Sequence, residues 1–355
     1  MNITFLIGNG FDLRVGMKTK YTDMYDGYIN SPTIDATIAD FKEDLASSAP
    51  KYETWSDFEM GMAEYAQRFD NEDDFIKCIR DFKAYMIKHL CTEEDKFFNA
   101  FNKSIVDESA ILEEFEHSIA NFYKNQIPNV KNRIKDIIKF NGWIKHINFI
   151  TFNYTKTLEF IKDRFELFHE LGSSDLRIEQ IVHIHGDLDN DVVLGVDNKE
   201  QIKNLKFNID RKVERAFIKP RFNHYYDEVR VQSAKDIIEN SDVICIYGLS
   251  LGESDLTWSK SVANWLLESS AKQLIYFAYG TNKFDSWNVD AQMDEEDEVK
   301  NSLLKRLHLL ESEAEKIYDQ IHVPVGENIF DIEKFLGYEH NIEILRNAEE
   351  CAAKA

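Results

Sequence analysis

Cysteine, proline and long apolar stretches are scarce in this sequence. The four cysteines, at positions 78, 91, 245 and 351, show no short paired spacing, so no zinc ribbon or CxxC redox motif is indicated and reduced thiols are expected. Only 5 prolines accompany 43% hydrophobic residues, which argues for a folded, helix-rich chain and against disorder. No stretch approaches the roughly 20 apolar residues of a membrane span. The first apolar run stops at Gly8, so we expect a cytoplasmic protein with no membrane partner.

Positive charge is also in short supply. The 355 residues include 64 acidic and 42 basic side chains, and the resulting net charge of −22 repels nucleic-acid phosphates at long range. The only basic concentration, RKVERAFIKPR at 211–221, is interpreted as a solvated helix face. Nucleic acid is therefore not expected as a partner, and no convincing carboxylate cluster indicates a metal.

Short apolar runs rich in β-branched and aromatic residues recur along the chain, with helical stretches between them. They lie at 3–7, 147–152, 181–185, 192–196, 242–248 and 273–280. Runs of this length suit strands covered on both faces, and strands separated by helices pair in parallel. The predicted fold class is α/β, with an open, mostly parallel sheet of about six strands flanked by helices.

The spacing of these runs also predicts the domain organisation. A sheet domain is expected from 1–20 and 146–290, a large inserted α-helical subdomain from 21–145, and a C-terminal helical extension from 291–355. The acidic segment DAQMDEEDE, after Gly280, predicts an exposed loop. One amphipathic helix is then predicted from Leu303, Leu307, Leu310, Ala314 and Ile317.

The first apolar run ends in a glycine turn, IGNGFDL. Gly8 and Gly10 allow the backbone to turn sharply and to approach another group closely, as in turns that bind nucleotides. Leu13 stands where the dinucleotide fingerprint has its third glycine, so a plain turn from strand to helix is an equally good interpretation. Asp12 could cap the helix that follows.

The second motif is FITFNYTKTLE, a predicted strand that runs into Asn153 and then into a helix. An amide at the carboxyl end of a strand is well placed to hold a ribose hydroxyl or a water, because ligands bind at that edge of open α/β sheets. The alternative is that Asn153 caps the following helix, which its residue type favours as strongly.

The third motif is IVHIHGDL, in which alternation predicts that His183 and His185 share one face of a strand. His185, beside Gly186, could act as a general base near neutral pH. A pair of metal ligands is an alternative, although no Cys or carboxylate set nearby completes a site. Satisfied core histidines are another, more plausible for His183.

The fourth motif is VICIYGLSLGESDLTW, a strand that ends in Gly248 and precedes a helix that Ser254 or Asp255 caps. Exposed backbone amides at such a turn, with the Ser250 hydroxyl, suit a diphosphate or ribose. A simple capped crossover is the alternative. The end of the next predicted strand, at 280–282, could similarly border an adenosine. Four predicted strands thus place small or polar residues at the same end.

The ordered set IGNGFDLRVGMKTKY, WSDFE, TFNYTKTLE, HIHG and GLSLGESD resembles the AbiH family of bacteriophage abortive-infection proteins. More remotely, the order resembles the sirtuin-like superfamily, a Rossmann-type fold in which a glycine turn, a Thr-x-Asn stretch, a His-Gly pair and a Gly-x-Ser-Leu turn surround NAD. The matching positions here are Gly8 to Gly10, Thr151 to Asn153, His185 with Gly186, and Gly248 to Leu251.

The superfamily resemblance implies a role for each of these positions. Asn153 would orient the nicotinamide ribose or the attacking water, and His185 would be the general base. The residues implied to contact NAD are Gly8, Asn9, Gly10, Phe11, Asp12, Thr151, His183, Gly186, Gly248, Ser250, Leu251 and Asp255. No metal is implied. Asp12 stands where sirtuins carry a small polar residue. In WSDFE, Glu59 either belongs to the core of the inserted helices or points toward the ligand end of the sheet.

The function that these resemblances imply is that of an antiviral effector that hydrolyses NAD, or a related nucleotide, to nicotinamide and ADP-ribose. An unknown phage component would release its activity, and self-association into a homo-oligomer is possible. Deacetylation is not expected, because the four-cysteine zinc module is missing. The first alternative is a non-catalytic nucleotide sensor of phage defence, and the second is a metal-dependent nuclease toxin.

Overall fold

The computed structural model describes residues 1–47, 58–102, 106–124, 126–142, 144–169, 175–280, 287–324, 329–332 and 335, without the side chains of 167–169. Residues 281 and 282, predicted to border an adenosine, lie outside this set. The predicted division into a sheet domain, a helical insertion and a C-terminal extension stays a prediction.

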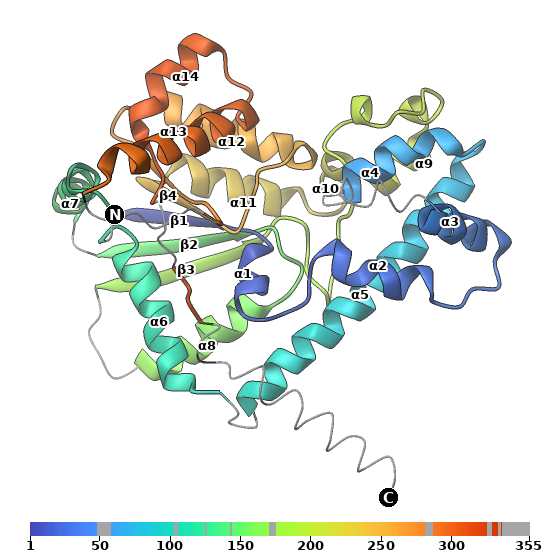
Figure 1. Ribbon diagram of the computed structural model, residues 1–355, viewed down its shortest axis with the longest axis horizontal. Helices are drawn as coiled ribbons and strands as arrows, with labels where there is room; N and C mark the ends of the chain where they lie inside the picture. The colour runs from blue at the N-terminus through green and yellow to red at the C-terminus, as the bar shows by residue number, and fades with distance from the viewer. Residues whose placement is uncertain are drawn as a thin grey trace, which may run out of the picture.

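A single sheet of six parallel strands organises the described part of the chain (Figure 1). The strands are β1 (Asn2–Ile7), β2 (Lys145–Thr151), β3 (Leu176–His183), β4 (Val243–Tyr247), β5 (Gln273–Phe277) and β6 (Ile321–His322). Their order is β3-β2-β1-β4-β5-β6, so β1 pairs with β2 on one side and β4 on the other. The sequence order therefore reverses at β1, which is the point where ligands bind in doubly wound sheets. The predicted fold class is confirmed.

Fourteen α-helices are assigned in the described residues. Those of the first half are α1 (Gly10–Arg14), α2 (Tyr21–Ile29), α3 (Ala36–Ser47), α4 (Phe58–Tyr65), α5 (Glu72–Asn102), α6 (Glu108–Asn121) and α7 (Pro128–Asn141). Those of the second half are α8 (Thr157–His169), α9 (Arg211–Phe217), α10 (Lys219–Tyr226), α11 (Glu228–Glu239), α12 (Leu256–Glu268), α13 (Val289–Arg306) and α14 (Glu311–Ile317). Figure 1 shows α2, α3, α4 and α9 grouped beyond one end of the strands.

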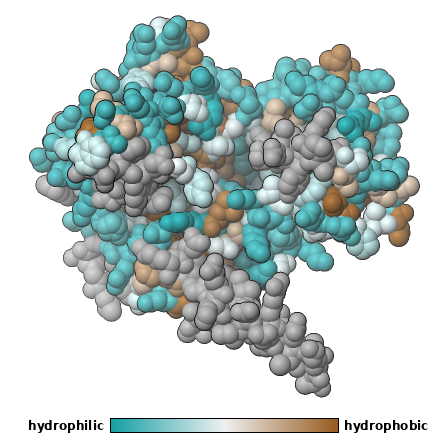
Figure 2. All heavy atoms as spheres, in the orientation of Figure 1, coloured by the Kyte–Doolittle hydropathy of each residue, from teal (hydrophilic) through white to brown (hydrophobic). Residues whose placement is uncertain are grey.

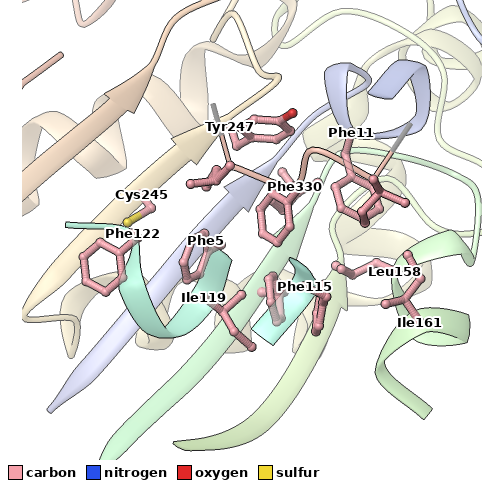
Figure 3. Close-up of a cluster of buried hydrophobic side chains, with 14 of the residues drawn as sticks. Phe5, Phe11, Phe115, Ile119, Phe122, Leu158, Ile161, Cys245, Tyr247 and Phe330 are labelled. Carbon is pink, nitrogen blue, oxygen red and sulfur yellow. The ribbon is translucent and has the colours of Figure 1, made fainter. Parts of the chain in front are cut away.

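Side-chain alternation in β1 divides the sheet between two cores. Phe5 points to the face covered by α6, α7 and α8, where it stacks on Phe149 with ring centroids 5.4 Å apart. Phe330, which follows the last described helix, is fully buried among the same rings (Figure 3). Leu6 points to the opposite face, where α11, α12 and α13 contribute the core around Trp265. The sheet is therefore buried on both faces, as its apolar runs predict.

We call α2, α3, α4, α5 and α9 the helical group. A third core holds this group together and also includes residues between α8 and α9. Phe58 of α4 stacks on Phe82 of α5 with centroids 3.7 Å apart. The run 192–196 packs into this same core and is not the predicted strand. It makes only a single bridge, between Val196 and Ile218. Its apolar side chains pack against helices, and a segment buried in this way has the same apolar composition as a buried strand.

Two predictions for the C-terminal part are wrong. DAQMDEEDE lies inside α13 and is not a loop, because its acidic residues occupy the first turns of a helix, where the macrodipole favours negative charge. An ion pair of 3.0 Å between Glu296 and Lys300 supports that helix. The apolar positions that follow belong to two helices, α13 and α14, since His308 between them has a φ of +53°.

The face of the molecule in Figure 2 is mainly hydrophilic, with scattered hydrophobic residues, as the large excess of acidic side chains requires. Among the helices within the described residues, none has the length and apolarity that crossing a membrane demands. The three described cysteines, Cys78, Cys91 and Cys245, are free thiols, as predicted.

Candidate functional site

The glycine turn after β1 packs against the turn after β4. The Gly10 N–H donates to the Gly248 carbonyl oxygen over 2.9 Å, and a Cβ on Gly10 would lie 2.4 Å from the Gly248 Cα. Gly248 itself has a φ of +63°, which favours glycine. The close approach that the sequence predicts is thus made by a second backbone turn, at the point where the strand order reverses.

A cavity of about 210 Å³ opens at the carboxyl ends of the strands beside this contact. We call it the acidic cavity. Of the residues predicted from sequence, it is lined by Asn9, Asp12, Asn153, His185, Gly248, Ser250 and Asp255. Residues from the helical group, including Glu59, complete its wall. The four strand ends therefore converge on one space.

Asn153 joins two of these strand ends. Its side-chain amide donates to the Gly8 carbonyl oxygen over 3.2 Å, and its own N–H donates to the Thr151 hydroxyl over 3.1 Å. It does not cap the next helix, because α8 begins four residues later, at Thr157. Asn153 is 7% exposed and faces the acidic cavity, a position from which its amide can orient a bound group.

Asp12, in the first turn of α1, is a buried carboxyl in the same cavity. Its Oδ2 accepts a hydrogen bond of 2.6 Å from the Thr155 hydroxyl, and its Oδ1 has no hydrogen-bond partner among the described residues. Burial raises the pKa of Asp12 to about 7, against the opposing effect of hydrogen bonds from Thr155 and Asn153. Near neutral pH this carboxyl therefore exists in both protonation states.

His185 is a buried, neutral imidazole paired with a carboxylate. Its Nε2 lies 2.9 Å from the Asp255 Oδ1. Burial, and next the Lys219 ammonium, lower the pKa of His185 against the effect of Asp255. Because Asp255 is ionised, the proton of the neutral ring is on Nε2, which donates to Asp255. The Nδ1 then carries a lone pair, and it has no hydrogen-bond partner among the described residues.

Lys219 lies at the centre of the charged residues, and sequence reasoning missed it. Its ammonium donates to Glu59 Oε2 over 2.7 Å, Asp255 Oδ1 over 2.9 Å and the Ser254 carbonyl oxygen over 3.1 Å. The prediction of a solvated face for 211–221 is wrong at this position, since Lys219 is 4% exposed. The sequence feature that could have indicated the burial of Lys219 is the apolar pair directly before it, Phe217 and Ile218, which are both buried.

The pKa values of the two carboxyls around Lys219 move in opposite directions. Burial alone would raise the pKa of Asp255, but the Lys219 ammonium and then His185 outweigh it and hold this pKa well below its usual range. Burial raises the pKa of Glu59 to about 7 despite Lys219. Asp255 is therefore the permanent carboxylate, and Glu59 can take up a proton near neutral pH. Glu59 is both buried in the helical group and directed to the ligand end of the sheet.

Several residues implied to contact NAD have structural partners instead. Phe11 packs on Phe330 with centroids 5.3 Å apart, and Leu251, with a φ of +51°, is buried in the core on the opposite face of the sheet. The Thr151 hydroxyl accepts from the N–H of Asn153. Gly186 has a φ of +76°, and a Cβ there would meet the backbone of Asp191. None of these four lines the acidic cavity.

His183 is not placed as predicted. β3 ends at His183, so His185 lies beyond the strand and the two rings do not share a strand face. The His183 Nδ1 lies 2.9 Å from the Asn153 carbonyl oxygen, and its Nε2 pairs with Glu159 of α8. His183 thus anchors the end of β2 to a helix and does not line the acidic cavity.

A second, larger cavity of about 780 Å³ adjoins the first on the side of β4 and β5. We call it the basic cavity, because three cations line it: Arg14, Lys20 and Arg306. Its wall also includes Gly10 and the aromatic residues Tyr247, Tyr276, Phe277 and Tyr279. The two cavities share Asn9, Gly248, Leu249 and Ser250. The two cavities therefore adjoin along these four residues.

The described residues contain no group of three or more His, Cys, Asp or Glu arranged to hold a metal ion. Glu59 and Asp255 are paired with Lys219, and the Asp12 Oδ2 accepts a hydrogen bond from Thr155.

No curated protein matches the sequence. The family model described as "Bacteriophage abortive infection AbiH" matches residues 4–277, which include most of β1, all of β2 to β5 and every residue of the acidic cavity. This range is more than half of the chain, and the resemblance to the AbiH family is confirmed; the resemblance to the sirtuin-like superfamily stays a prediction. The chain belongs to the AbiH family of bacteriophage abortive-infection proteins.

Proposed function

We propose that this protein, whose family indicates a function in abortive phage infection, acts by cleaving the bond between nicotinamide and ribose in NAD. The observation that carries the proposal is the buried Nδ1 of His185, which has no hydrogen-bond partner among the described residues and belongs to a residue that lines the acidic cavity. A neutral imidazole with a free lone pair is the form that accepts a proton as a general base.

The two cavities suit the two ends of this substrate. The nicotinamide of NAD is a pyridinium cation, and the acidic cavity presents the three carboxyls of Asp12, Glu59 and Asp255 against the single ammonium of Lys219. The phosphates carry negative charge and are favoured beside Arg14, Lys20 and Arg306. The aromatic wall of the basic cavity suits adenine. In this placement the ribose and diphosphate lie along the residues that the two cavities share, beside the contact between Gly10 and Gly248.

The reaction follows from this placement. The His185 Nδ1 removes a proton from water as the water oxygen forms a bond to C1′ of the ribose. The bond between C1′ and the pyridinium nitrogen breaks, and its electron pair neutralises the leaving nicotinamide. Positive charge develops on the ribose in such a transition state, so the oriented water matters more than a strong acid. The products are nicotinamide, ADP-ribose and one proton.

The test is chromatography of NAD incubated with purified protein, beside Asn153→Ala and His185→Ala. His224→Ala is the matched control, because His224 is an exposed histidine on α10. We expect nicotinamide release by the native protein and by the control, with a loss of about 10²- to 10⁴-fold in His185→Ala. A His185→Ala variant that is folded and fully active would contradict the proposal.

A second candidate is a nucleotide sensor without catalysis. The observation in its favour is that the glycine contact and the cations of the basic cavity do not involve His185. Calorimetry separates the two functions. A sensor would bind NAD with the same affinity after His185→Ala and release no nicotinamide at any protein concentration.

A further inference from the structure

Lys219 connects segments that are far apart in the sequence. It is the first residue of α10, and its ammonium contacts Glu59 of α4, the Ser254 carbonyl oxygen and Asp255, which precedes α12. All three protons of the ammonium are therefore bonded to oxygen within the protein. Lys219 is 4% exposed, so no proton is left over for a ligand.

We propose that Lys219 is the positioning residue of this site, which holds Asp255 in place and thereby keeps the Nδ1 of His185 unprotonated and without a hydrogen-bond partner. The inference rests on the proposed function and deepens it. Both Lys219 and the His185 Nε2 bond to one atom, the Asp255 Oδ1, at 2.9 Å each. The carboxylate is therefore shared, and the ammonium supplies the positive charge that balances it.

The charged groups that face His185 determine the direction in which loss of Lys219 would shift the pKa of this histidine. Lys219 from α10 and Arg230 from α11 both lower the pKa of His185, and Asp255 raises it. Lys219 itself faces Asp255, Glu59 and Tyr154. Without the ammonium, Asp255 would remain as a buried carboxylate whose nearest partner is the imidazole. The stable arrangement is then an ion pair, in which His185 gains a proton at Nδ1 and is no longer a base.

Glu59 provides a matched comparison, because its substitution removes a negative charge from the cluster, whereas Lys219→Met removes a positive one. Glu59→Gln removes one carboxyl from the cluster while the amide can still accept from the Gly195 N–H, which now donates to Glu59 over 2.9 Å. The hydrogen bond between Lys219 and Asp255 does not involve Glu59. We therefore expect Lys219→Met to raise the pKa of His185 and Glu59→Gln to leave it low.

The experiment uses the full chain with isotope-labelled histidine and follows the His185 ring by NMR from pH 5.5 to 8.5. The His185 signal is assigned by its absence in His185→Ala. In the unaltered protein we expect a neutral ring with its proton on Nε2 throughout. In Lys219→Met we expect a ring that is protonated at both nitrogens at the acidic end. Lys219→Arg keeps the positive charge and should keep the neutral ring.

Two results would overturn the proposal. One is a folded Lys219→Met variant in which His185 keeps its neutral state across the whole range. The other is a ring in the unaltered protein that carries its proton on Nδ1, a measurement that stands even if Lys219→Met does not fold. Neither measurement needs a substrate, so a failure of NAD cleavage leaves this test unaffected.

The NAD assay adds a second readout. In Lys219→Met the acidic limb of the pH profile of kcat should move to higher pH, with a loss of at least about tenfold near neutral pH and little change in KM. Lys219→Arg should restore most of the rate. A fall in kcat of equal size at every pH would indicate a purely structural role for Lys219 and would refute the proposal.

Discussion

Replacing Phe330 by alanine should destabilise the protein strongly, because this ring completes the core beneath β1. Phe330 is fully buried and packs against Phe5, Phe11, Phe115 and Tyr247, with ring centroids 5.2 to 6.0 Å away (Figure 3). Truncation of a buried Phe costs about 3 to 5 kcal/mol, and the aromatic contacts favour the middle of this range or above. We therefore expect a loss of about 4 kcal/mol in the free energy of unfolding.

The assay is urea unfolding followed by tryptophan fluorescence and circular dichroism, with Phe140→Ala as the control. Phe140 lies on α7 and is 92% exposed, so the same substitution there should change the free energy of unfolding by less than about 0.5 kcal/mol. If Phe330→Ala and Phe140→Ala unfold at the same urea concentration, Phe330 does not belong to the core, and the reasoning fails.

Three further predictions concern the site. Gly10→Ala should lower the free energy of unfolding by about 1 to 3 kcal/mol, because its Cβ would lie 2.4 Å from the Gly248 Cα; chemical denaturation measures this, and a change below about 0.5 kcal/mol would contradict the close contact. Because the pKa of Asp12 is raised by burial, the native protein loses stability as the pH rises from about 4 to 7 and this carboxyl must ionise. Asp12→Asn cannot ionise, so it should be more stable than the native protein at pH 8, by up to about 4 kcal/mol. At pH 4 the two proteins should be equally stable. Unfolding at both pH values checks this, and an equal difference at each would contradict it. Arg306→Ala should weaken NAD binding about tenfold in calorimetry while Lys305→Ala, outside both cavities, should not; equal affinities would argue against phosphate in the basic cavity.

The sheet could be predicted from sequence because β1, β4 and β5 are short, mostly apolar runs, and five of the six strands lie within or beside such runs. β6 has only two residues, Ile321 and His322, too few for any periodic pattern. The run 192–196 was predicted as a strand because composition does not distinguish burial under helices from burial in a sheet. Gly195, with a φ of +155° and its N–H bonded to Glu59, belongs to neither element.

The site was only partly predictable for a different reason. The carboxyl ends of parallel strands must meet at one edge, so the meeting of Asn153, His185 and Gly248 follows from the fold class alone. A buried ion pair has no local pattern, and Lys219 and Glu59 lie 160 residues apart in the chain. Apart from Phe217 and Ile218, the sequence near Lys219 shows several basic residues, which favour solvent exposure on average. The decisive charge of the site is therefore visible only in three dimensions.

The ammonium of Lys219 also has a consequence for how the protein is made. Its partners come from positions 59, 254 and 255, so during synthesis the charged cluster is incomplete until the ribosome has passed Asp255. A chain cut or stalled before that point has no carboxylate to hold His185. Under the proposed function, unfinished copies would therefore lack the positioned base that NAD cleavage requires.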